Sequence, residues 1–470
     1  MPFNSITFIF VFLPFALAAY YLVPKKYKNI MLLVSSLIFY AWGEPVYVIL
    51  LILSILFNYF CGRDIEEKLD TPWLAKRSLI FAIVINVLLL SFFKYFGFLM
   101  ENINTIFQTE IPYRVLSLPI GISFYTFQAI SYLTDIFRGK IRAQSDIVKF
   151  GVYMAMFPKL IIGPIVRYET IEEQLTERTV SIRKLGIGAM YFVCGLGKKV
   201  ILADSIGVVY DQVAAMEVGT ISALTAWVGC IAFAFQIYFD FSGYSDMAMG
   251  LGKMVGFDIE RNFHYPYISK SISEFWRRWH ISLSSWFKEY VYIPLGGNKC
   301  DPVRHMWNLL IVWLLTGCWH GAQWNFIFWG IYYGVIQILE KYVFGRWLAN
   351  RKDSVQRYVT LFFIMIGWVF FFSPNIGYAF RYISAMLLFG STGLADAQAL
   401  FLIGTNWMFF AACGVASTSL GLNLLNILVN TYKNKTVRTV AACIVYIGIF
   451  VISVAFLVTG EARPFLYFKF

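Results

Sequence analysis

The chain has 470 residues, of which 59% are hydrophobic and only 14% are charged. A soluble globular protein is about 45–50% apolar and about 25% charged, so this composition excludes an ordinary soluble fold and predicts an all-α, polytopic integral membrane protein. The net charge of +12 does not indicate a nucleic-acid partner, because the basic residues stand in short loops between apolar runs.

Apolar runs long enough for membrane helices recur along the whole chain and predict about ten to twelve membrane segments, including re-entrant or short helices. The first run has no Lys or Arg before it, so we predict a retained span rather than a signal peptide. The loop charges place both termini outside the cytoplasm. No internal repeat or linker divides the chain, which predicts a single membrane domain over residues 1–470. The predicted spans cover residues 6–23, 30–42, 46–60, 79–100, 116–137, 185–202, 221–241, 306–328, 329–343, 359–372, 400–429 and 440–458.

One further apolar run, residues 150–166, is interrupted by Pro158, Lys159, Gly163 and Pro164. Basic residues flank it on both sides, which indicates a segment that leaves the membrane on the side it entered. Irregular backbone at membrane depth is tolerated only where protein or a wet cavity surrounds it. We therefore predict a re-entrant segment here.

The region of about residues 253–305 is basic and is predicted to lie in the cytoplasm. Ser271 and Glu274 have the spacing of a capping box and predict the start of a helix. At about 100° per residue the helix is amphipathic and suited to the cytoplasmic interface, with His280 at the edge of its aromatic face. A packed histidine bonded to a backbone carbonyl is the alternative to a functional role. The aromatic face comprises Trp276, Trp279, Leu283, Trp286, Phe287 and Tyr290, and the opposite face comprises Arg277, Arg278, Ser285, Lys288 and Glu289.

His320, in the stretch TGCWHGAQWN, falls inside the predicted span 306–328. An ionisable side chain at that depth costs several kcal/mol and usually faces a cavity with a function. Gly317 and Gly321 flank it and leave room for a close approach. Tryptophans at positions 313, 319, 324 and 329 would keep the imidazole neutral. A neutral imidazole near pH 7 is suited to general base catalysis.

Other candidate chemistry is weaker. There is no HExxH motif, acidic pair or Cys/His cluster at ligand spacing, so no metal site is expected. Cys318 lies two residues from His320, on a different face of a helix, which disfavours a His–Cys dyad. His264 and His305 stand among loop residues and are expected to be solvated or interfacial. Asp240 and Asp246, near the end of a predicted span, could orient a histidine, accept a hydrogen bond or cap a helix.

Four stretches resemble the bacterial membrane-bound O-acyltransferase (MBOAT) family: FDFSGYSDMAMGLG, FWRRWHISLSSWFKEYVYIPLGGN, LLTGCWHGAQWNFIFWG and the ending RPFLYFKF. The resemblance runs from FYAWGEP near the start to the last residue, and PLGGN and the length favour the alginate O-acetyltransferase branch over the D-alanyl transferases. It implies an MBOAT-type fold with a passage through the bilayer of the bacterial inner (plasma) membrane. It also implies catalytic roles for His320, in WHG, and His280, in RWH. We further expect Trp279, Trp319, Asn325 and Asp240 to contact substrate.

The resemblance implies transfer of an acyl group, most simply acetyl, from a cytoplasmic donor towards hydroxyls of an exported polysaccharide. The transfer is direct or passes through a secreted acyltransferase partner. The donor, acetyl-CoA or another acyl thioester, is a substrate, so no bound cofactor is expected, and membrane lipid is the remaining partner. Three alternatives stay open: D-alanyl transfer to teichoic acid, a scaffold, and a non-catalytic transporter of an activated acyl group. Lys94, Lys159 and Asp240, at or near membrane depth, would support the transporter.

Overall fold

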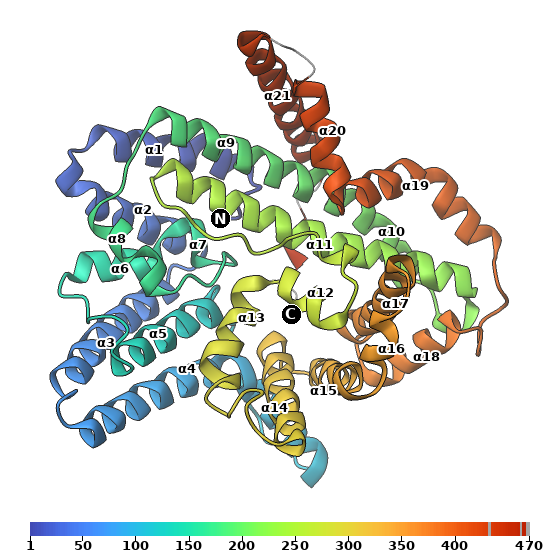
Figure 1. Ribbon diagram of the computed structural model, residues 1–470, viewed down its shortest axis with the longest axis horizontal. Helices are drawn as coiled ribbons and strands as arrows, with labels where there is room; N and C mark the ends of the chain where they lie inside the picture. The colour runs from blue at the N-terminus through green and yellow to red at the C-terminus, as the bar shows by residue number, and fades with distance from the viewer. Residues whose placement is uncertain (431–433, 461–462, 467–470) are drawn as a thin grey trace. The chain divides into compact units, whose positions relative to one another are not determined.

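The computed structural model describes residues 1–430, 434–460 and 463–466, and these residues form helices and loops without a strand. They group into two compact units, whose helices are labelled in Figure 1. Unit 1 comprises Met1–Phe192 and Ser245–Arg261, and unit 2 comprises Val193–Tyr244 and Asn262–Phe470. The predicted all-α fold is confirmed, whereas the single domain over residues 1–470 stays a prediction.

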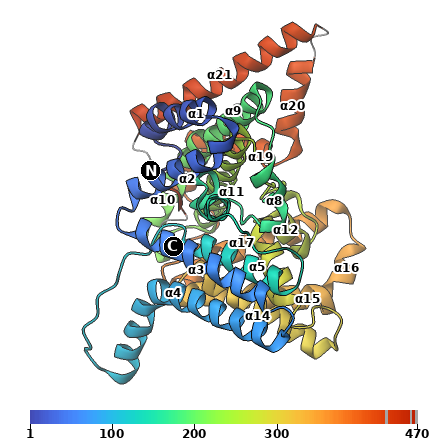
Figure 2. The ribbon, with the colours of Figure 1, turned by 90° about the vertical axis from the view of Figure 1, so that its left-hand side faces the viewer.

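Unit 1 is built around helices that pack along their length, with α3, α4 and α5 side by side (Figure 2). The amides of Asn58 on α3 and Asn86 on α4 are buried and hydrogen-bonded to each other at 2.8 and 3.2 Å, a polar contact of the kind that joins helices in an apolar setting. The break predicted between spans 30–42 and 46–60 is confirmed, since α2 ends at Gly43 and α3 begins at Tyr47. The helices are α1 (Leu13–Leu22), α2 (Lys28–Gly43), α3 (Tyr47–Glu67), α4 (Pro72–Phe107), α5 (Ile122–Phe137), α6 (Ile147–Ala155), α7 (Phe157–Leu160), α8 (Tyr168–Thr176) and most of α9 (Ile182–Gly197).

The predicted interruption of residues 150–166 is confirmed. Helix α6 ends at Ala155, and α7 is a single short turn with Pro158 in its first positions. Lys159 is fully buried, and its ammonium donates hydrogen bonds to Gln128 Oε1 at 2.8 Å and to the carbonyl of Tyr153. The surrounding residues are buried as well, which meets the condition under which irregular backbone is tolerated at membrane depth. A re-entrant path through a membrane stays a prediction.

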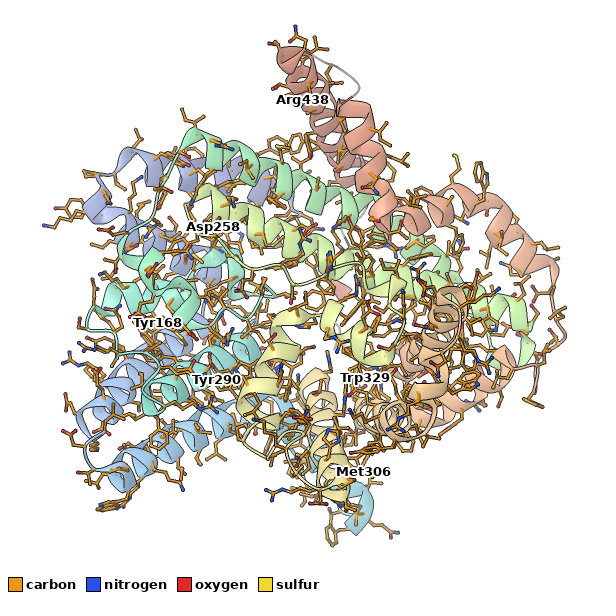
Figure 3. The ribbon with its side chains drawn as sticks, viewed as in Figure 1. Tyr168, Asp258, Tyr290, Met306, Trp329 and Arg438 are labelled. Atoms are coloured by element: carbon orange, nitrogen blue, oxygen red, sulfur yellow. The ribbon has the colours of Figure 1, made fainter. Side chains whose placement is uncertain are left out.

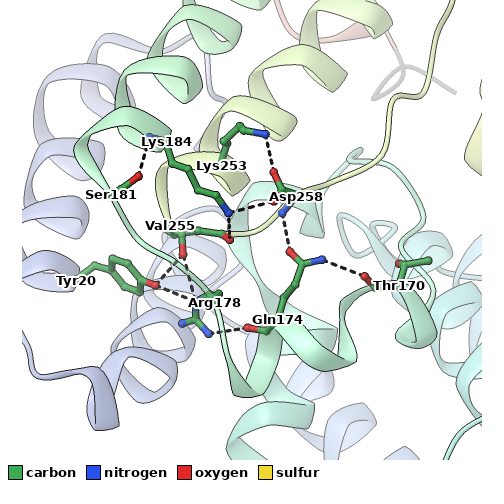
Figure 4. A network of polar contacts seen from close by, with 10 residues as sticks. Tyr20, Thr170, Gln174, Arg178, Ser181, Lys184, Lys253, Val255 and Asp258 are labelled. Carbon is green, nitrogen blue, oxygen red and sulfur yellow. Dashed lines mark hydrogen bonds and ion pairs between the residues drawn. The ribbon is translucent and has the colours of Figure 1, made fainter.

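A polar network in unit 1 ties the start of the chain to the end of α11 (Ala223–Met254) (Figure 4). Arg178 donates from Nε to the Tyr20 hydroxyl at 3.0 Å and to the carbonyl of Val255 at 3.2 Å. Asp258 accepts from Lys253 at 2.6 Å and from Lys184 at 3.1 Å. Burial alone would raise the pKa of Asp258, but these two lysines outweigh burial and hold that pKa below its ordinary value. The loop after α11 is thereby fixed before it enters unit 2.

Unit 2 holds the rest of α11 and the following helices, joined by short turns. The predicted span 400–429 is wrong as one segment, because the chain divides at Ser417 into α19 and α20, where the Thr418 hydroxyl accepts the N–H of Leu420 at 3.2 Å. Helix α18 was not predicted. The helices are α10 (Asp204–Ala214), α12 (Ile272–Arg278), α13 (Ile281–Phe287), α14 (Pro302–His320), α15 (Trp324–Leu339), α16 (Gly345–Ala349), α17 (Asp353–Phe372), α18 (Ile376–Met386), α19 (Ala397–Ala416), α20 (Ser419–Asn430) and α21 (Lys435–Thr459).

Six helical stretches of the described residues are long and apolar enough to cross a membrane. The larger number of ten to twelve segments, and the side of the membrane on which each loop lies, stay predictions. The six are Tyr47–Glu67, Pro72–Phe107, Ala223–Met254, Asp353–Phe372, Ala397–Ala416 and Thr436–Thr459.

Candidate active site

His320 is the last residue of α14, which forms a hairpin with α15 (Figure 1). The predicted division between residues 328 and 329 is wrong, because the turn comes directly after His320. Glycines allow the two helices to approach: a Cβ on Gly317 would lie 2.4 Å from the carbonyl oxygen of Phe326, and one on Gly330 would lie 2.4 Å from that of Trp313. The hairpin therefore places His320 at the end of a helix and not in the middle of a span.

Aromatic rings surround the His320 imidazole, which is 7% exposed. The ring centroids of Trp319, Trp329 and Phe371 lie 5.0, 4.9 and 5.3 Å from that of the imidazole, all near edge-to-face. Figure 3 labels Trp329, a fully buried side chain of α15. Trp319 and Trp329 thus enclose the histidine as predicted, whereas Trp324 is 54% exposed.

The predicted amphipathic helix around His280 is broken at that residue. The start of α12 is confirmed, since the Ser271 hydroxyl accepts the N–H of Glu274 at 3.0 Å. The helix ends after Arg278, and His280 has φ 44° and ψ 55°, a left-handed conformation, before α13 begins. A non-glycine residue in this conformation costs about 1–2 kcal/mol. The prediction of one continuous helix is therefore wrong.

Contacts on both sides of His280 hold this strained backbone. Asn262 accepts the N–H of Ile281 on its carbonyl at 2.9 Å and that of Ser282 on its side-chain oxygen at 3.0 Å. On the other side, Trp276 of α12 packs against Trp313 and Tyr333 of the α14–α15 hairpin, at 4.7 and 4.8 Å between centroids. The break redirects the chain, and the aromatic face, apart from the half-buried Tyr290, is buried in the protein.

His280 itself is 1% exposed, and its ring lies 4.7 Å from Phe241 and 5.9 Å from Trp319 between centroids. Neither ring nitrogen has a hydrogen-bond partner within the part of the chain that the structure describes. The carbonyl-bonded histidine considered as an alternative is therefore not observed. Burial lowers the pKa of His280 from its ordinary value of 6.5 to about 3, so the imidazole is neutral near pH 7.

Both histidines line one cavity of about 290 Å³ in unit 2. The exposed side chains of Arg277 and Lys288 line it too, so the cavity opens to the outside. Sequence reasoning missed its polar lining. Thr316 stands one turn before His320 on the same face of α14, a spacing that could have revealed it, whereas Gln337 and Ser284 come from segments that only the fold brings together. The polar lining consists of Ser273, Arg277, His280, Ser284, Ser285, Lys288, Tyr292, Thr316, His320 and Gln337.

The remaining predicted site residues divide into two groups. Trp279 lines the cavity, and the ring of Trp319 lies close to both imidazoles. Asn325 and Asp240 are not among the described residues that line the cavity. The Asn325 amide donates to the carbonyl of Ser373 at 2.9 Å and thereby binds the end of α17. A role for Asn325 in contacting substrate stays a prediction.

Asp240 belongs to a buried ion network on α11. Its carboxylate pairs with Lys199 at 2.5 Å and accepts the N–H of Leu466 at 2.7 Å, and Lys199 also pairs with Asp204 at 2.8 Å. Of the uses left open for Asp240, the structure shows the acceptance of a hydrogen bond. Its partners include part of the RPFLYFKF ending, of which residues 467–470 lie outside the described residues.

The other two histidines differ from each other. His264 is exposed, as expected. His305 is only 6% exposed, and its two ring nitrogens are hydrogen-bonded to the hydroxyls of Tyr292 at 2.8 Å and Tyr342 at 2.6 Å. Of the two alternatives for His305, the solvated one is wrong, because the start of α14 packs against the segments that carry both tyrosines; an interfacial position stays a prediction.

Comparison with known proteins identifies the family of this fold and site. The model of the membrane-bound O-acyltransferase family matches residues 137–380, which include both cavity histidines. The chain belongs to this family. The resemblance found in the sequence motifs is thereby confirmed, and the protein is an O-acyltransferase.

Three relatives show which proteins this O-acyltransferase is similar to. It is 42% identical over 408 residues to "Probable alginate O-acetylase AlgI" of Azotobacter vinelandii, covering 84% of this chain and 80% of the relative. It is 32% identical over 519 residues to the peptidoglycan O-acetyltransferase of Helicobacter pylori, covering 100% and 97%. Its identity to the teichoic acid D-alanyltransferase of Streptococcus thermophilus is 28% over 250 residues, covering 50% and 58%.

Proposed function

We propose that this O-acyltransferase moves an acetyl group from a thioester donor towards hydroxyls of an exported polysaccharide, directly or through a secreted partner. The observation that carries the proposal is the pair of imidazoles, His280 and His320, on one open cavity. Relatives named for O-acetylation of alginate and of peptidoglycan support it. Because those two polymers differ, the proposal concerns exported polysaccharide as a class.

The reaction converts a thioester and a hydroxyl into an ester and a thiol. His320 accepts the proton of the acceptor hydroxyl as oxygen attacks the thioester carbonyl, and the same proton passes to the departing thiolate sulfur. His280 is neutral, and its N–H donates to the carbonyl oxygen of the donor, where negative charge develops. Within the described residues both ring nitrogens of His280 lack a partner, so one is open to this bond.

The charge of the cavity supports an anionic donor. Arg277 and Lys288 line its open side, and neither forms an ion pair within the part of the chain that the structure describes. A phosphate-bearing thioester such as acetyl-CoA would place its phosphates against these cations. The basic region 253–305 that holds them is predicted to lie in the cytoplasm. We therefore place donor loading on the cytoplasmic side of the bacterial inner (plasma) membrane, with both termini outside.

The cavity also favours an acetyl group over D-alanine. Three aromatic rings within 5.3 Å between centroids surround His320, an apolar setting that suits an uncharged acyl group. A D-alanyl group would add an ammonium, which needs a carboxylate when it is removed from water. No Asp or Glu is among the described residues that line the cavity. D-alanyl transfer to teichoic acid is therefore the second candidate.

The decisive experiment replaces the proposed base. In purified protein supplied with acetyl-CoA and an oligosaccharide acceptor, His320→Ala should lower kcat by about 10²–10⁴-fold, the usual contribution of acid–base catalysis. The matched control is His264→Ala, because His264 is exposed and is not among the cavity-lining residues. This variant should keep wild-type kcat. If folded His320→Ala protein transferred acetyl at the wild-type rate, the assignment of His320 as the base would be wrong.

A further inference from the structure

Glu340 is a buried carboxylate held entirely by neutral donors of another segment. It is 8% exposed, and its Oε1 accepts the N–H of Ile272 at 2.6 Å. Its Oε2 accepts the N–H of Ser273 at 2.9 Å and the hydroxyl of Ser273 at 2.6 Å. No lysine or arginine pairs with it among the described residues. Three hydrogen bonds to one charged group make this contact stronger than an ordinary side-chain bond.

The position of Glu340 depends on an irregular turn at the end of α15. Residues Glu340–Phe344 form a π-helical stretch, and a Cβ on Gly345 would lie 2.1 Å from the carbonyl oxygen of Glu340. Glycine at 345 is therefore required for this turn. Single π-helical turns inside helices are frequent at functional sites. Here the turn presents the carboxylate to the start of α12.

The two segments joined by Glu340 carry the two histidines of the cavity. Helix α12 leads directly to His280, and α15 is paired in the hairpin with α14, which ends at His320. Ser273, bonded to Glu340, lines the cavity, as does Gln337, one turn before Glu340 on α15. Glu340 therefore contacts the cavity lining from outside the cavity, next to the segments that carry both histidines.

We propose that Glu340 is a positioning residue, which clamps the start of α12 to the hairpin and so sets the place of His280 relative to His320. It touches no substrate. The left-handed backbone of His280 lies between this clamp and the Asn262 contacts that follow it, so release of α12 lets His280 relax away from the cavity. Catalysis is sensitive to such shifts, because a misplacement of about 1 Å can cost about 10²-fold in rate. The catalytic consequence rests on the proposed acetyl transfer.

The test uses Glu340→Gln, which keeps the shape but puts an amide against two backbone N–H groups. Its exposed counterpart is Asp353→Asn, which removes the Lys270–Asp353 ion pair of 2.6 Å beside the same helix. Glu340→Gln should lower kcat by about 10²-fold with little change in KM for acetyl-CoA, and should speed hydrogen exchange of the amides from Ile272 to Trp279. Asp353→Asn should change neither. If Glu340 were only structural, its substitution would lower the amount of folded protein, and the folded fraction would not show a lowered kcat with unchanged KM.

Three further outcomes decide the matter. If Glu340→Gln does not fold, Glu340→Asp keeps the charge but draws it back by one methylene, and it should give an intermediate kcat. Wild-type kcat and unchanged exchange in either folded variant would overturn the clamp. If the wild-type protein transfers no acetyl group from acetyl-CoA to either a polysaccharide acceptor or a secreted partner, the proposed function fails, and the hydrogen exchange of α12 still decides whether Glu340 holds that helix.

Discussion

Gly321→Ala should displace His320 without touching any group that carries charge. Gly321 is extended, with φ −165°, so alanine brings no backbone strain. A Cβ there would lie 2.2 Å from Cδ2 and 2.3 Å from Cε2 of Phe326, against about 3.4 Å for an ordinary contact. Either the Phe326 ring or the end of α14 must move by about 1.2 Å.

Both movements reach His320, the proposed base. The end of α14 is His320 itself, and the Phe326 ring packs 5.1 Å from Phe371, which lies 5.3 Å from the imidazole between centroids. A shift of this size corresponds to about a 10²-fold loss of kcat, or about 2.7 kcal/mol of transition-state stabilisation. Overpacking should also lower the free energy of unfolding by about 1–3 kcal/mol.

The assay is the steady-state rate of acetyl transfer by purified protein, together with thermal unfolding in the same detergent. Gly404→Ala is the matched control, because Gly404 lies on α19 and a Cβ there meets nothing within 4 Å. That variant should keep wild-type kcat and gain about 0.4–1 kcal/mol in stability. Wild-type kcat in folded Gly321→Ala would refute the reasoning that the turn after α14 sets the place of His320.

Two predictions concern charge. Burial lowers the pKa of His280 to about 3, against 6.5 in the unfolded chain, so its neutral form contributes stability that is present above pH 6.5 and lost as the pH falls towards 3. Thermal unfolding measured from pH 7 to 4 should show a decline in stability that is smaller in His280→Asn. Equal declines in the wild-type protein and the variant would contradict the buried neutral ring. Arg277→Gln should raise KM for acetyl-CoA several-fold at nearly unchanged kcat, whereas Arg63→Gln, in unit 1, should not. An equal KM for acetyl-CoA in Arg277→Gln would remove Arg277 from the donor site.

Much of this architecture was predictable because its signals are local. The break before Tyr47, the interrupted stretch around Pro158 and the capped start of α12 at Ser271 each follow from a few neighbouring residues. The two histidines could be singled out because an ionisable group among aromatic residues is costly unless it has a use. The family motifs around them then gave the activity, which the comparisons confirm.

The errors arose where packing between distant segments overrides the local pattern. Uniform helical periodicity concealed the break at His280, which depends on bonds to Asn262 from the preceding loop. Hydropathy alone could not locate the turn after His320, because the glycine contacts between α14 and α15 decide the register of the hairpin. The ion pair of Asp240 could not be predicted either, because its partner Lys199 lies 41 positions earlier and carries no motif, and a substrate contact for Asp240 stays a prediction.

The geometry of the cavity explains why these irregularities occur together. No Asp or Glu is among the described residues that line it, so the orientation of His280 cannot come from a carboxylate partner of the kind found in a Ser-His-Asp triad. It comes from the backbone, which is left-handed at His280. Asn262 holds the residues that follow His280, and α12 holds those that precede it. A neutral donor positioned in this way can stabilise the oxyanion without placing a second charge near the thioester. The backbone strain at His280 thus accompanies the orientation of an imidazole that has no carboxylate partner. The hydrogen bonds from α12 to Glu340 oppose the relaxation of that strain.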